Sequence, residues 1–425
     1  MIQRVRGFRD ILPDQIGRWQ TIERLATEVF ENFGFKEIRI PILEKTDLFA
    51  RSIGKVTDIV EKEMYTFTDR SGDMLTLRPE ATAAVARAYL QNKLYVADPV
   101  QKLYTIGPMF RRERPQKGRY RQFYQINAEV IGVAAPTADV QLIIMLLTLM
   151  QRLQVPDLTV QINTLGDADC RPKFQAALGQ FLASISDGLC DDCKRRRTEN
   201  PLRVLDCKNP TCQALLEEVP TIHDFLCDAC HDHFETTCRL LEKEGIAFNI
   251  NERLVRGLDY YTRTTFEIQT RALGAQSAVA GGGRYDGLMK IIGGPQTPAT
   301  GFAIGLDRLA EIIEEQWTGT GRKPVVFIAA LGDEAHEKAF GWINRLNREG
   351  IYAEMDYSGR SLKSQMKQAN RSGAGYVLIV GDNELTSGKA VLRDMAASTQ
   401  EEVSVEDVIA VIQQVATVNK SGGGR

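Results

Sequence analysis

The spacing of apolar residues changes along the chain between a helical period and a period of two, and these periods predict its main elements. Residues 14–34 carry apolar side chains at helical spacing, with Asp14 as the expected cap. Residues 139–153 predict a second helix, apolar enough to lie in a core. Residues 104–132 follow a period of two instead, which predicts two strands turned back by the polar loop 115–119.

Shorter patterns surround this hairpin. A second, smaller hairpin is expected across the turn at residues 69–72, and residues 158–165 predict another strand. Residues 170–245 are polar and mostly helical in pattern, which predicts an insertion between two parts of one sheet. Strand patterns then resume, and residues 301–309 run from a strand into a helix.

The last quarter of the chain has a different rhythm. Residues 315–324 have the composition of a linker, and strands and helices alternate after them. This alternation predicts a separate α/β domain of about 100 residues. We therefore expect two domains, residues 1–322 and residues 323–425, with the insertion inside the first.

Composition limits the class of protein. Of 425 residues, 43% are hydrophobic and 25% charged, as in ordinary soluble globular proteins. No apolar run is as long as a membrane span, and the charged start lacks the apolar core of a signal peptide, so we expect a cytoplasmic protein without membrane contact. The net charge of −2 gives no general affinity for nucleic acid, so any RNA must bind local basic patches.

The large hairpin carries such a patch. Six arginine or lysine residues lie between Arg111 and Arg121, an excess that favours an anionic partner. Gln125 and Glu129 share one face of the second strand and span roughly 13 Å, a distance suited to a small polar molecule. A charged ribbon exposed to water is the alternative interpretation.

The sequence YTIGPMFRRERPQKGRYRQFYQINAEVIG, residues 104–132, resembles motif 2 of the class II aminoacyl-tRNA synthetases, most closely that of the histidyl-tRNA synthetases. The helix, strand and proline of residues 14–41 resemble motif 1, the dimer element of this class. GFAIGLDRL, residues 301–309, is similar to motif 3, and LVRGLDYY, residues 254–261, matches the segment typical of the histidyl enzymes.

The resemblance implies a mechanism built on arginine. Arg111 would hold the α-phosphate of ATP, Arg308 the γ-phosphate and adenine, and Arg256 would lie beside the α-phosphate. Two anions must be brought together in adenylate formation, so fixed cations, with Mg²⁺ accompanying ATP, would provide electrostatic rather than covalent catalysis.

The resemblance also implies a histidine pocket. Glu129 and Tyr261 would serve the two imidazole nitrogens, since neutral imidazole has one donor and one acceptor. Glu80 and Thr82, in the RPE-x-T segment, would hold the substrate ammonium, although Glu80 could instead only complement a helix dipole. The full set assigned to histidine is Glu80, Thr82, Gln125, Glu129, Tyr260, Tyr261 and Tyr285, the last from the glycine-rich GGGRYDGL.

The implied RNA contacts lie in two places. The tip of the large hairpin would approach the acceptor stem of tRNA, where Gln116 is the candidate reader of a base edge. The C-terminal domain resembles the anticodon-binding domain of several class II enzymes, which would read unpaired bases by hydrogen bonding and stacking.

Six of the eight cysteines lie between residues 190 and 230. Cys190-x2-Cys193 and Cys207-x4-Cys212 have nearly the spacing of a four-thiolate zinc site. Cys227-x2-Cys230 follows, with histidines 223, 231 and 233 nearby. The pattern leaves two alternatives open, a structural Zn²⁺ or a set of buried thiols, and the resemblance assigns no ligands.

Taken together, the resemblance implies a homodimeric enzyme that joins histidine to tRNA(His) at the expense of ATP. Its fold would be an α+β catalytic domain, a mostly antiparallel sheet flanked by helices, followed by the α/β anticodon-binding domain. The alternative is a catalytically inert relative, the regulatory subunit of ATP phosphoribosyltransferase. That subunit usually lacks the C-terminal domain and has eroded arginine and tyrosine motifs. In this chain the pattern of the C-terminal domain is present and the arginine and tyrosine motifs are intact.

Overall fold

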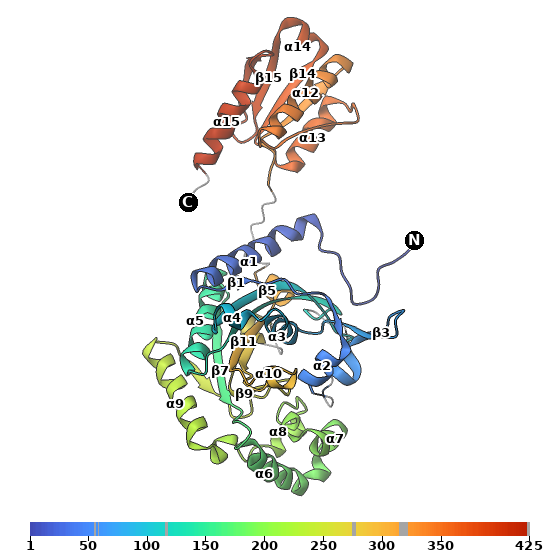
Figure 1. Ribbon diagram of the computed structural model, residues 1–425. Helices are drawn as coiled ribbons and strands as arrows, with labels where there is room; N and C mark the ends of the chain where they lie inside the picture. The colour runs from blue at the N-terminus through green and yellow to red at the C-terminus, as the bar shows by residue number, and fades with distance from the viewer. Residues whose placement is uncertain (55–56, 58, 115–117, 274–277, 314–321, 423–425) are drawn as a thin grey trace. The chain divides into compact units, whose positions relative to one another are not determined.

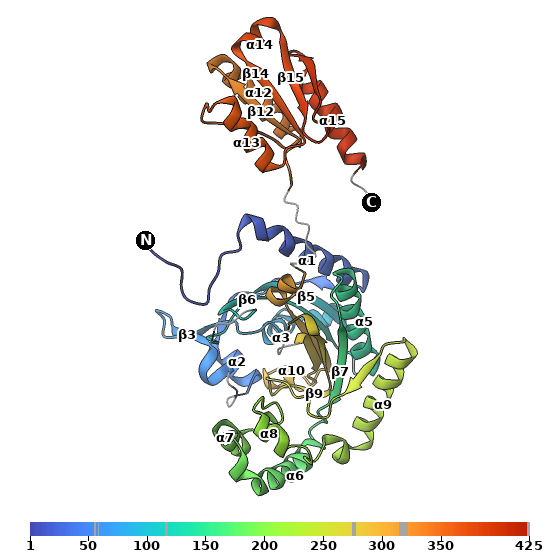
Figure 2. The same ribbon diagram turned by 180° about the vertical axis from the view of Figure 1, so that it is seen from behind.

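The computed structural model describes residues 1–54, 57, 59–114, 118–273, 278–313 and 322–422. The chain divides into two compact units, Met1–Thr318 and Gly319–Arg425. Figures 1 and 2 show the two units from opposite sides. Among the helices that the structure describes, none is both long and apolar enough to cross a membrane.

An eight-stranded sheet organises the first unit, in the order β1-β5-β6-β11-β10-β9-β7-β8. The central pairings are antiparallel, and the two outer pairs, β1 with β5 and β7 with β8, are parallel. The prediction of a mostly antiparallel sheet flanked by helices is therefore confirmed. The strands are β1 (Lys36–Glu37), β5 (Gln101–Phe110), β6 (Gln122–Ile131), β7 (Leu158–Thr164), β8 (Phe248–Ile250), β9 (Thr262–Thr270), β10 (Ala278–Arg284) and β11 (Ala299–Gly305).

The large hairpin of the sequence is the pair β5–β6. Its register places Gln125 opposite Gly107 and Glu129 opposite Leu103. The first strand ends at Phe110, so Arg111 lies just beyond the strand, where its N–H still donates to the carbonyl of Arg121 at 2.9 Å. The hairpin tip at residues 115–117, and with it Gln116, lies outside the described residues.

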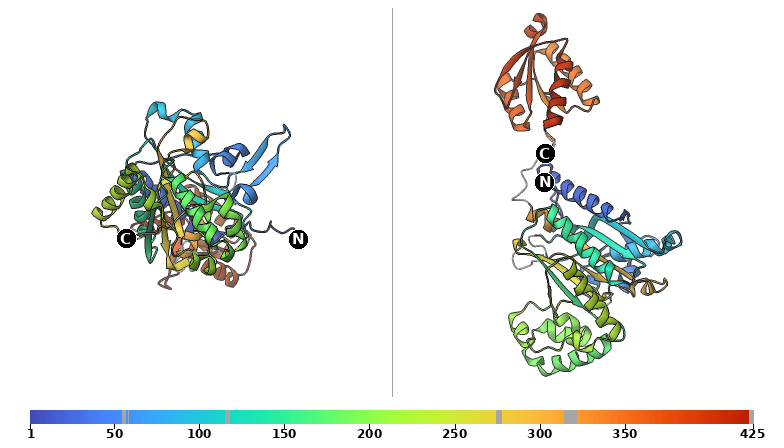
Figure 3. Two further views of the ribbon diagram at one scale, coloured as in Figure 1. Left: turned by 90° about the horizontal axis from the view of Figure 1, so that it is seen from below. Right: turned by 90° about the vertical axis from the view of Figure 1, so that its left-hand side faces the viewer.

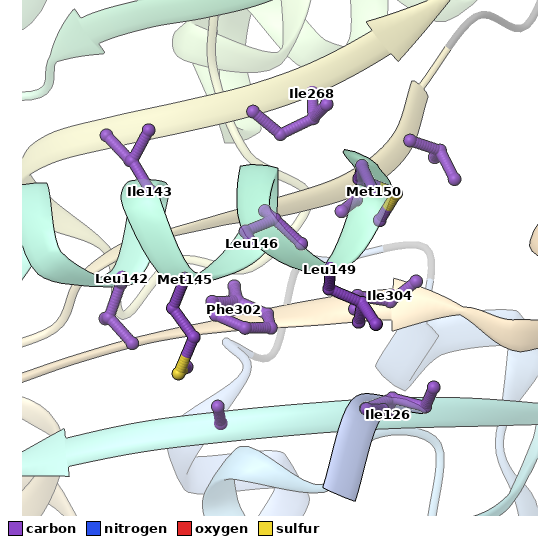
Figure 4. Packing of buried hydrophobic residues seen from close by; sticks show 14 of the residues in the cluster. Ile126, Leu142, Ile143, Met145, Leu146, Leu149, Met150, Ile268, Phe302 and Ile304 are labelled. Carbon is purple, nitrogen blue, oxygen red and sulfur yellow. The ribbon is translucent and has the colours of Figure 1, made fainter. Parts of the chain in front are cut away.

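Two long helices cover one face of the sheet. These are α1 (Pro13–Asn32) and α5 (Pro136–Arg152), and Figure 4 shows the apolar side of α5 lying over β11 and β6. Leu142, Leu146 and Leu149 are fully buried there, and each such side chain contributes about 1.5–3 kcal/mol. The cap residue of α1 is Leu12 rather than Asp14, because Pro13 is the first helical residue and Asp14 follows it inside the first turn.

The opposite face of the sheet carries smaller elements. The turn at residues 69–72 joins β3 (Tyr65–Thr68) to β4 (Met74–Leu77) as predicted, and β2 (Leu43–Lys45) completes a three-stranded antiparallel sheet. The helices on this side are α2 (Thr46–Ser52), α3 (Thr82–Gln91), α4 (Leu94–Ala97) and α10 (Leu288–Ile291), while α11 (Leu306–Ile312) follows β11. Short turns of π and 3₁₀ helix add Ile59–Glu63 and Arg271–Leu273.

The cysteine-rich segment between β7 and β8 is helical, as expected. Its helices are α6 (Arg171–Ser184), α7 (Asp191–Glu199), α8 (Pro210–Leu215) and α9 (Asp228–Lys243), with 3₁₀ turns at Ser186–Gly188, Pro201–Val204 and Ile222–Phe225. Figures 1 and 3 show α6, α7 and α8 gathered at one end of this unit, with α9 leading back along the sheet. Buried leucines and most of the cysteines form a core of its own.

The second unit is an α/β domain with a five-stranded sheet in the order β13-β12-β14-β15-β16. Its strands are β12 (Val326–Leu331), β13 (Ala353–Met355), β14 (Tyr376–Gly381), β15 (Lys389–Asp394) and β16 (Gln400–Ser404). Its helices are α12 (Asp333–Arg348), α13 (Leu362–Ser372), α14 (Asp382–Ser387) and α15 (Val408–Gly422). The sequence pattern did not reveal α14 and β16, since neither shows a clear apolar period. Most of the expected linker, residues 315–324, lies outside the described residues.

Candidate active site

A cavity of about 310 Å³ opens on the face of the large sheet. Residues from distant parts of the sequence line it, including most of those that the sequence singled out. The predicted residues on its wall are Glu80, Thr82, Arg111, Gln125, Arg256, Tyr260, Tyr261 and Arg308. The three arginines therefore converge on one cavity, although 197 positions separate the first from the last in the chain (308 − 111).

Neighbouring residues hold the side chain of Arg111 in one orientation. Its Nε donates to the carbonyl of Pro79 at 2.8 Å, and its guanidinium lies 5.3 Å from the ring centroid of Phe123. Nη1 is 3.8 Å from Glu113, which also pairs with Arg119 at 3.3 Å. These contacts fix the orientation of Arg111 and keep a positive guanidinium on the cavity wall.

Arg256 lies against the strand that contains the glycine run. Its Nη1 is 3.1 Å from Glu267 of β9, and its guanidinium is 5.8 Å from the ring of Tyr261. A Cβ at Gly281 would lie 2.3 Å from Nη2 of Arg256. The glycine run lies in strand β10, and Gly281 provides the space that the arginine occupies.

Arg308 occupies the first turn of α11, at the junction that the sequence predicts. Its Nη1 donates to the carbonyl of Ala278 at 2.6 Å. Burial and the nearby positive charge of Arg119 lower the pKa of Arg308 from its usual value. The adjacent Asp307 pairs with Arg9 at 2.7 Å and accepts the N–H of Tyr124 at 2.7 Å, which fixes this turn against the sheet.

Glu80 lies at the inner end of the cavity and caps a helix. Its carboxylate accepts the backbone N–H of Thr82 at 2.7 Å and of Ala83 at 2.9 Å, at the start of α3. Burial raises the pKa of Glu80. The helix-capping role is thus present in this structure, and the side chain also lines the cavity.

Glu129 lies directly behind the cavity wall and is 1% exposed. It accepts the hydroxyl of Thr82 at 2.7 Å and, on its other oxygen, the hydroxyl of Tyr285. On the neighbouring strand a Cβ at Gly301 would lie 1.7 Å from this carboxylate, so only glycine leaves room for it. Burial raises the pKa of Glu129 to about 8, and the hydrogen bonds from Tyr285 and Thr82 offset only part of this effect.

Three tyrosines pack around this buried end. The ring centroid of Tyr260 lies 4.8 Å from that of Tyr261 and 5.6 Å from that of Tyr285. The hydroxyl of Tyr260 donates to Glu80 at 3.4 Å. Burial raises the pKa of all three phenols, which therefore act as neutral donors and acceptors at ordinary pH.

Several residues of the cavity wall were not among the candidates from the sequence. They are Glu113, Arg119, Asn127 and Glu267. The signal for Asn127 was available, because it lies between Gln125 and Glu129 on the same face of β6. Within the described residues, the buried side-chain oxygens of Gln125 and Asn127 and the Nε of Arg256 have no hydrogen-bond partner. Unsatisfied polar atoms on a cavity wall are typical of a site that binds a polar ligand.

A family model described as histidyl-tRNA synthetase matches residues 7–178 and 194–309, and an anticodon-binding domain model matches residues 325–415. The chain belongs to the histidyl-tRNA synthetase family. A histidine–tRNA ligase of Desulfatibacillum aliphaticivorans is 59% identical over 96% of this chain and 97% of its own, and one of Desulforapulum autotrophicum is 58% identical over 96% of each. The structure of apo Staphylococcus aureus histidyl-tRNA synthetase has a TM-score of 0.80 at 35% identity, covering 97% of this chain and all of that one.

These similarities identify the chain as an aminoacyl-tRNA synthetase and favour the histidine–tRNA ligase over the regulatory subunit. The family model leaves residues 179–193 unmatched, a gap within the cysteine-rich segment. Two of the histidines near its cysteines have other partners: His223 pairs with Asn163 at 3.0 Å, and His233 pairs with Asp139 at 2.8 Å. His231 is largely exposed.

Proposed function

We propose that the chain activates histidine with ATP to give histidyl-adenylate and pyrophosphate, and then transfers the histidyl group to the 3′ end of tRNA(His), and that the residues of the cavity and the buried carboxylate behind it carry out these steps. The observation that carries these roles is the meeting of Arg111, Arg256 and Arg308 on one cavity, where Thr82 of the wall donates to Glu129 behind it. A triphosphate and an imidazole require these two different environments side by side.

Histidine would bind at the inner end. The carboxylate of Glu129 would accept the imidazole N–H, and the hydroxyl of Tyr261 would serve the other ring nitrogen. Glu80, Thr82 and Gln125 would hold the ammonium group. Tyr260 and Tyr285 would position the two carboxylates, since their hydroxyls already donate to Glu80 and Glu129.

ATP would lie along the arginines. An oxygen of the histidine carboxylate attacks the α-phosphorus, the bond to the bridging oxygen breaks, and pyrophosphate leaves. Arg111 and Arg256 would stabilise the charge that builds on the α-phosphoryl oxygens, and Arg308 would bind the γ-phosphate and adenine. Mg²⁺ would arrive with ATP as part of the substrate, and the carboxylates of Glu113 and Glu267 on the same wall are oxygen ligands of the kind it prefers.

Transfer would follow on the same cavity. A hydroxyl of the terminal ribose of tRNA attacks the carbonyl carbon of the adenylate, and AMP leaves with the bonding electrons. Gln116, at the hairpin tip outside the described residues, would meet the acceptor stem. The second unit would read the anticodon. Both substrates, ATP and tRNA, favour a cytoplasmic location.

A homodimer is part of the proposal. The apolar stripe of α1 lies in the core of its own chain, with Ile22 and Ala26 fully buried, so that stripe does not require a partner. Leu43, Phe67 and Met74 of the small sheet are 38–51% exposed and are apolar surface that a second copy could cover. Light scattering should give twice the mass of one chain, and a monomer at micromolar concentration would refute this part.

The test of the activation step is histidine-dependent exchange between pyrophosphate and ATP. Arg256→Ala should reduce exchange by about 10²–10³-fold, the effect of losing one transition-state donor. Arg239→Ala, on the exposed side of α9, is the matched control and should leave exchange unchanged. Circular dichroism should show that both variants are folded. Near-normal exchange by folded Arg256→Ala would remove this residue from the mechanism.

A further inference from the structure

The cysteine-rich segment brings metal-ligating side chains together at two separate points. The sulfur atoms of Cys190, Cys193, Cys207 and Cys212 all lie within 4.8 Å of one another. The same is true of ligand atoms from Asp167, Cys170, Cys227 and Cys230. These two sets include all the cysteines except Cys238, and all eight are free thiols.

The first set, here called the four-cysteine cluster, comes from three elements. Cys190 precedes α7 and Cys193 lies within it, Cys207 follows the 3₁₀ turn Pro201–Val204, and Cys212 lies in α8. The sulfurs of Cys190 and Cys207 are 3.9 Å apart. Four sulfurs placed tetrahedrally at zinc bonds of about 2.3 Å are about 3.8 Å apart, whereas a disulfide requires about 2.0 Å.

Backbone amides donate to these sulfurs. The N–H of Cys190 donates to the sulfur of Cys212 at 3.2 Å, and that of Asn209 donates to the sulfur of Cys207 at 3.4 Å. Such donors stabilise a thiolate and orient metal ligands. Three of the four cysteines are at most 7% exposed, which closes the site to solvent ligands.

The second set, here called the mixed cluster, repeats this design with one carboxylate. Cys227 precedes α9 and Cys230 lies within it, as Cys190 and Cys193 do at α7. The N–H of Cys227 donates to the sulfur of Cys170 at 3.1 Å. No histidine completes the set. The carboxylate of Asp167 completes it, and the spacing of Asp167 to Cys170 in the sequence did not indicate this.

The carboxylate of Asp167 is divided between two tasks. Its Oδ1 accepts the N–H groups of Asp169 at 3.0 Å and Cys170 at 3.3 Å, which fixes the turn before α6. Its Oδ2 faces the sulfur of Cys227 at 4.0 Å and is 3.5 Å from Arg263. One oxygen is therefore available to a metal that three thiolates already bind, and zinc accepts aspartate alongside cysteine.

Both clusters lie next to contacts with the segment that carries Arg256 and Tyr261. Arg203, close before Cys207, donates to the carbonyl of Arg256 at 3.3 Å. Arg171, next to Cys170, donates to the carbonyl of Tyr261. A metal at each cluster would therefore fix the cysteine-rich segment where it supports the wall of the active site.

We propose that the cysteine-rich segment binds two structural Zn²⁺ ions, one at the four-cysteine cluster and one at the mixed cluster. Closed sites with four protein ligands are structural rather than catalytic, because no position is left for water or substrate. Small helices with few large apolar side chains gain stability from such ions, since the binding free energy adds to the folding free energy.

The test is the zinc content of the full-length chain, purified without an affinity tag and dialysed against a mild chelator. Elemental analysis should find two zinc ions per chain. Cys193→Ser and Cys230→Ser should each retain one, and the double variant should retain none. Cys238→Ser is the matched control, since Cys238 lies on α9 with Cys230 but outside both clusters, and it should retain two.

Two further measurements separate lost binding from lost folding. Cobalt replacement in the unaltered chain should give the thiolate-to-cobalt charge-transfer and tetrahedral d–d absorption, at two cobalt ions per chain. Titration with a thiol reagent under native conditions should find the seven clustered thiols protected until the metal is removed. A chain with no bound zinc and freely reactive thiols would overturn the proposal. One zinc per chain, lost in Cys193→Ser but not in Cys230→Ser, would overturn the mixed cluster.

Discussion

Glu129 and Asp139 are both buried carboxylates of the first unit, 1% and 0% exposed, but their surroundings differ in kind. Asp139 of α5 lies 2.8 Å from His233 of α9 and 3.2 Å from Arg284 at the end of β10. Burial alone would raise its pKa, and the histidine and arginine outweigh that effect and lower it. Glu129 instead accepts hydrogen bonds from two neutral hydroxyls, and burial raises its pKa to about 8.

The difference separates a structural carboxylate from a binding one. Arg284 is 0% exposed, and besides Asp139 it donates to the carbonyls of Val133 and Ala135 and pairs with Asp286. These contacts join α5, α9 and the end of β10, and Asp139 meets two basic side chains there. Within the described residues, the hydroxyls of Thr82 and Tyr285 hold Glu129 in place of a basic side chain, and on the proposed function the N–H of the substrate imidazole would be a further partner. A buried carboxylate with a raised pKa beside a cavity is a typical binding-site signature.

The comparison predicts the largest effect at Asp139. Asp139→Ala removes the fully buried carboxylate beside the guanidinium of Arg284, so the first unit should lose about 3–5 kcal/mol of unfolding free energy. Urea unfolding followed by fluorescence measures this loss. Asp232→Ala, whose side chain is 83% exposed next to His233, should change the unfolding free energy by less than about 0.5 kcal/mol. Equal effects of the two substitutions would show that the Asp139 cluster is not structural.

The second prediction concerns pH. An ordinary glutamate in the unfolded chain has a pKa of about 4.3, and Glu129 in the folded chain has one of about 8. The unfolded state therefore releases its proton first, and stability from this group is complete below about pH 4.3 and is lost as pH rises towards 8. Between pH 5 and pH 8 the loss should be roughly 3 kcal/mol.

Glu129→Gln removes this titration. Between pH 5 and pH 8, the unfolding free energy of this variant, measured in urea, should fall by roughly 3 kcal/mol less than that of the unaltered chain. Glu235→Gln, on the exposed side of α9, is the control and should follow the unaltered chain. Parallel pH curves for all three proteins would mean that Glu129 is ionised at neutral pH and has a cation partner.

The smallest expected effect is on histidine binding by the same variant. An amide can still offer an oxygen to the imidazole N–H, but it lacks the negative charge, so the histidine KM in exchange should rise about 10–100-fold, or about 1.4–2.8 kcal/mol. The KM for ATP should stay within about twofold. A rise in the ATP KM with an unchanged histidine KM would place Glu129 on the wrong side of the cavity.

The sequence alone was enough to predict the motifs and those helices and strands whose apolar residues recur with a strong period. The period of two in residues 104–132 predicted β5–β6 and the shared face of Gln125 and Glu129, because alternation along a strand is a local property. The apolar helix at α5 and the strand-to-helix junction at Arg308 were also predicted. Short or weakly periodic elements such as α14 and β16 were not, since their local pattern does not distinguish them from loops.

The tertiary structure decided how each polar side chain is satisfied. Thr82 meets Glu129 across 47 positions, Asp139 meets Arg284 across 145, and Asp167 joins cysteines as far away as Cys230. No local pattern fixes such meetings. A carboxylate's pKa depends on every element packed around it, so only the folded chain could raise the pKa of Glu129 and lower that of Asp139.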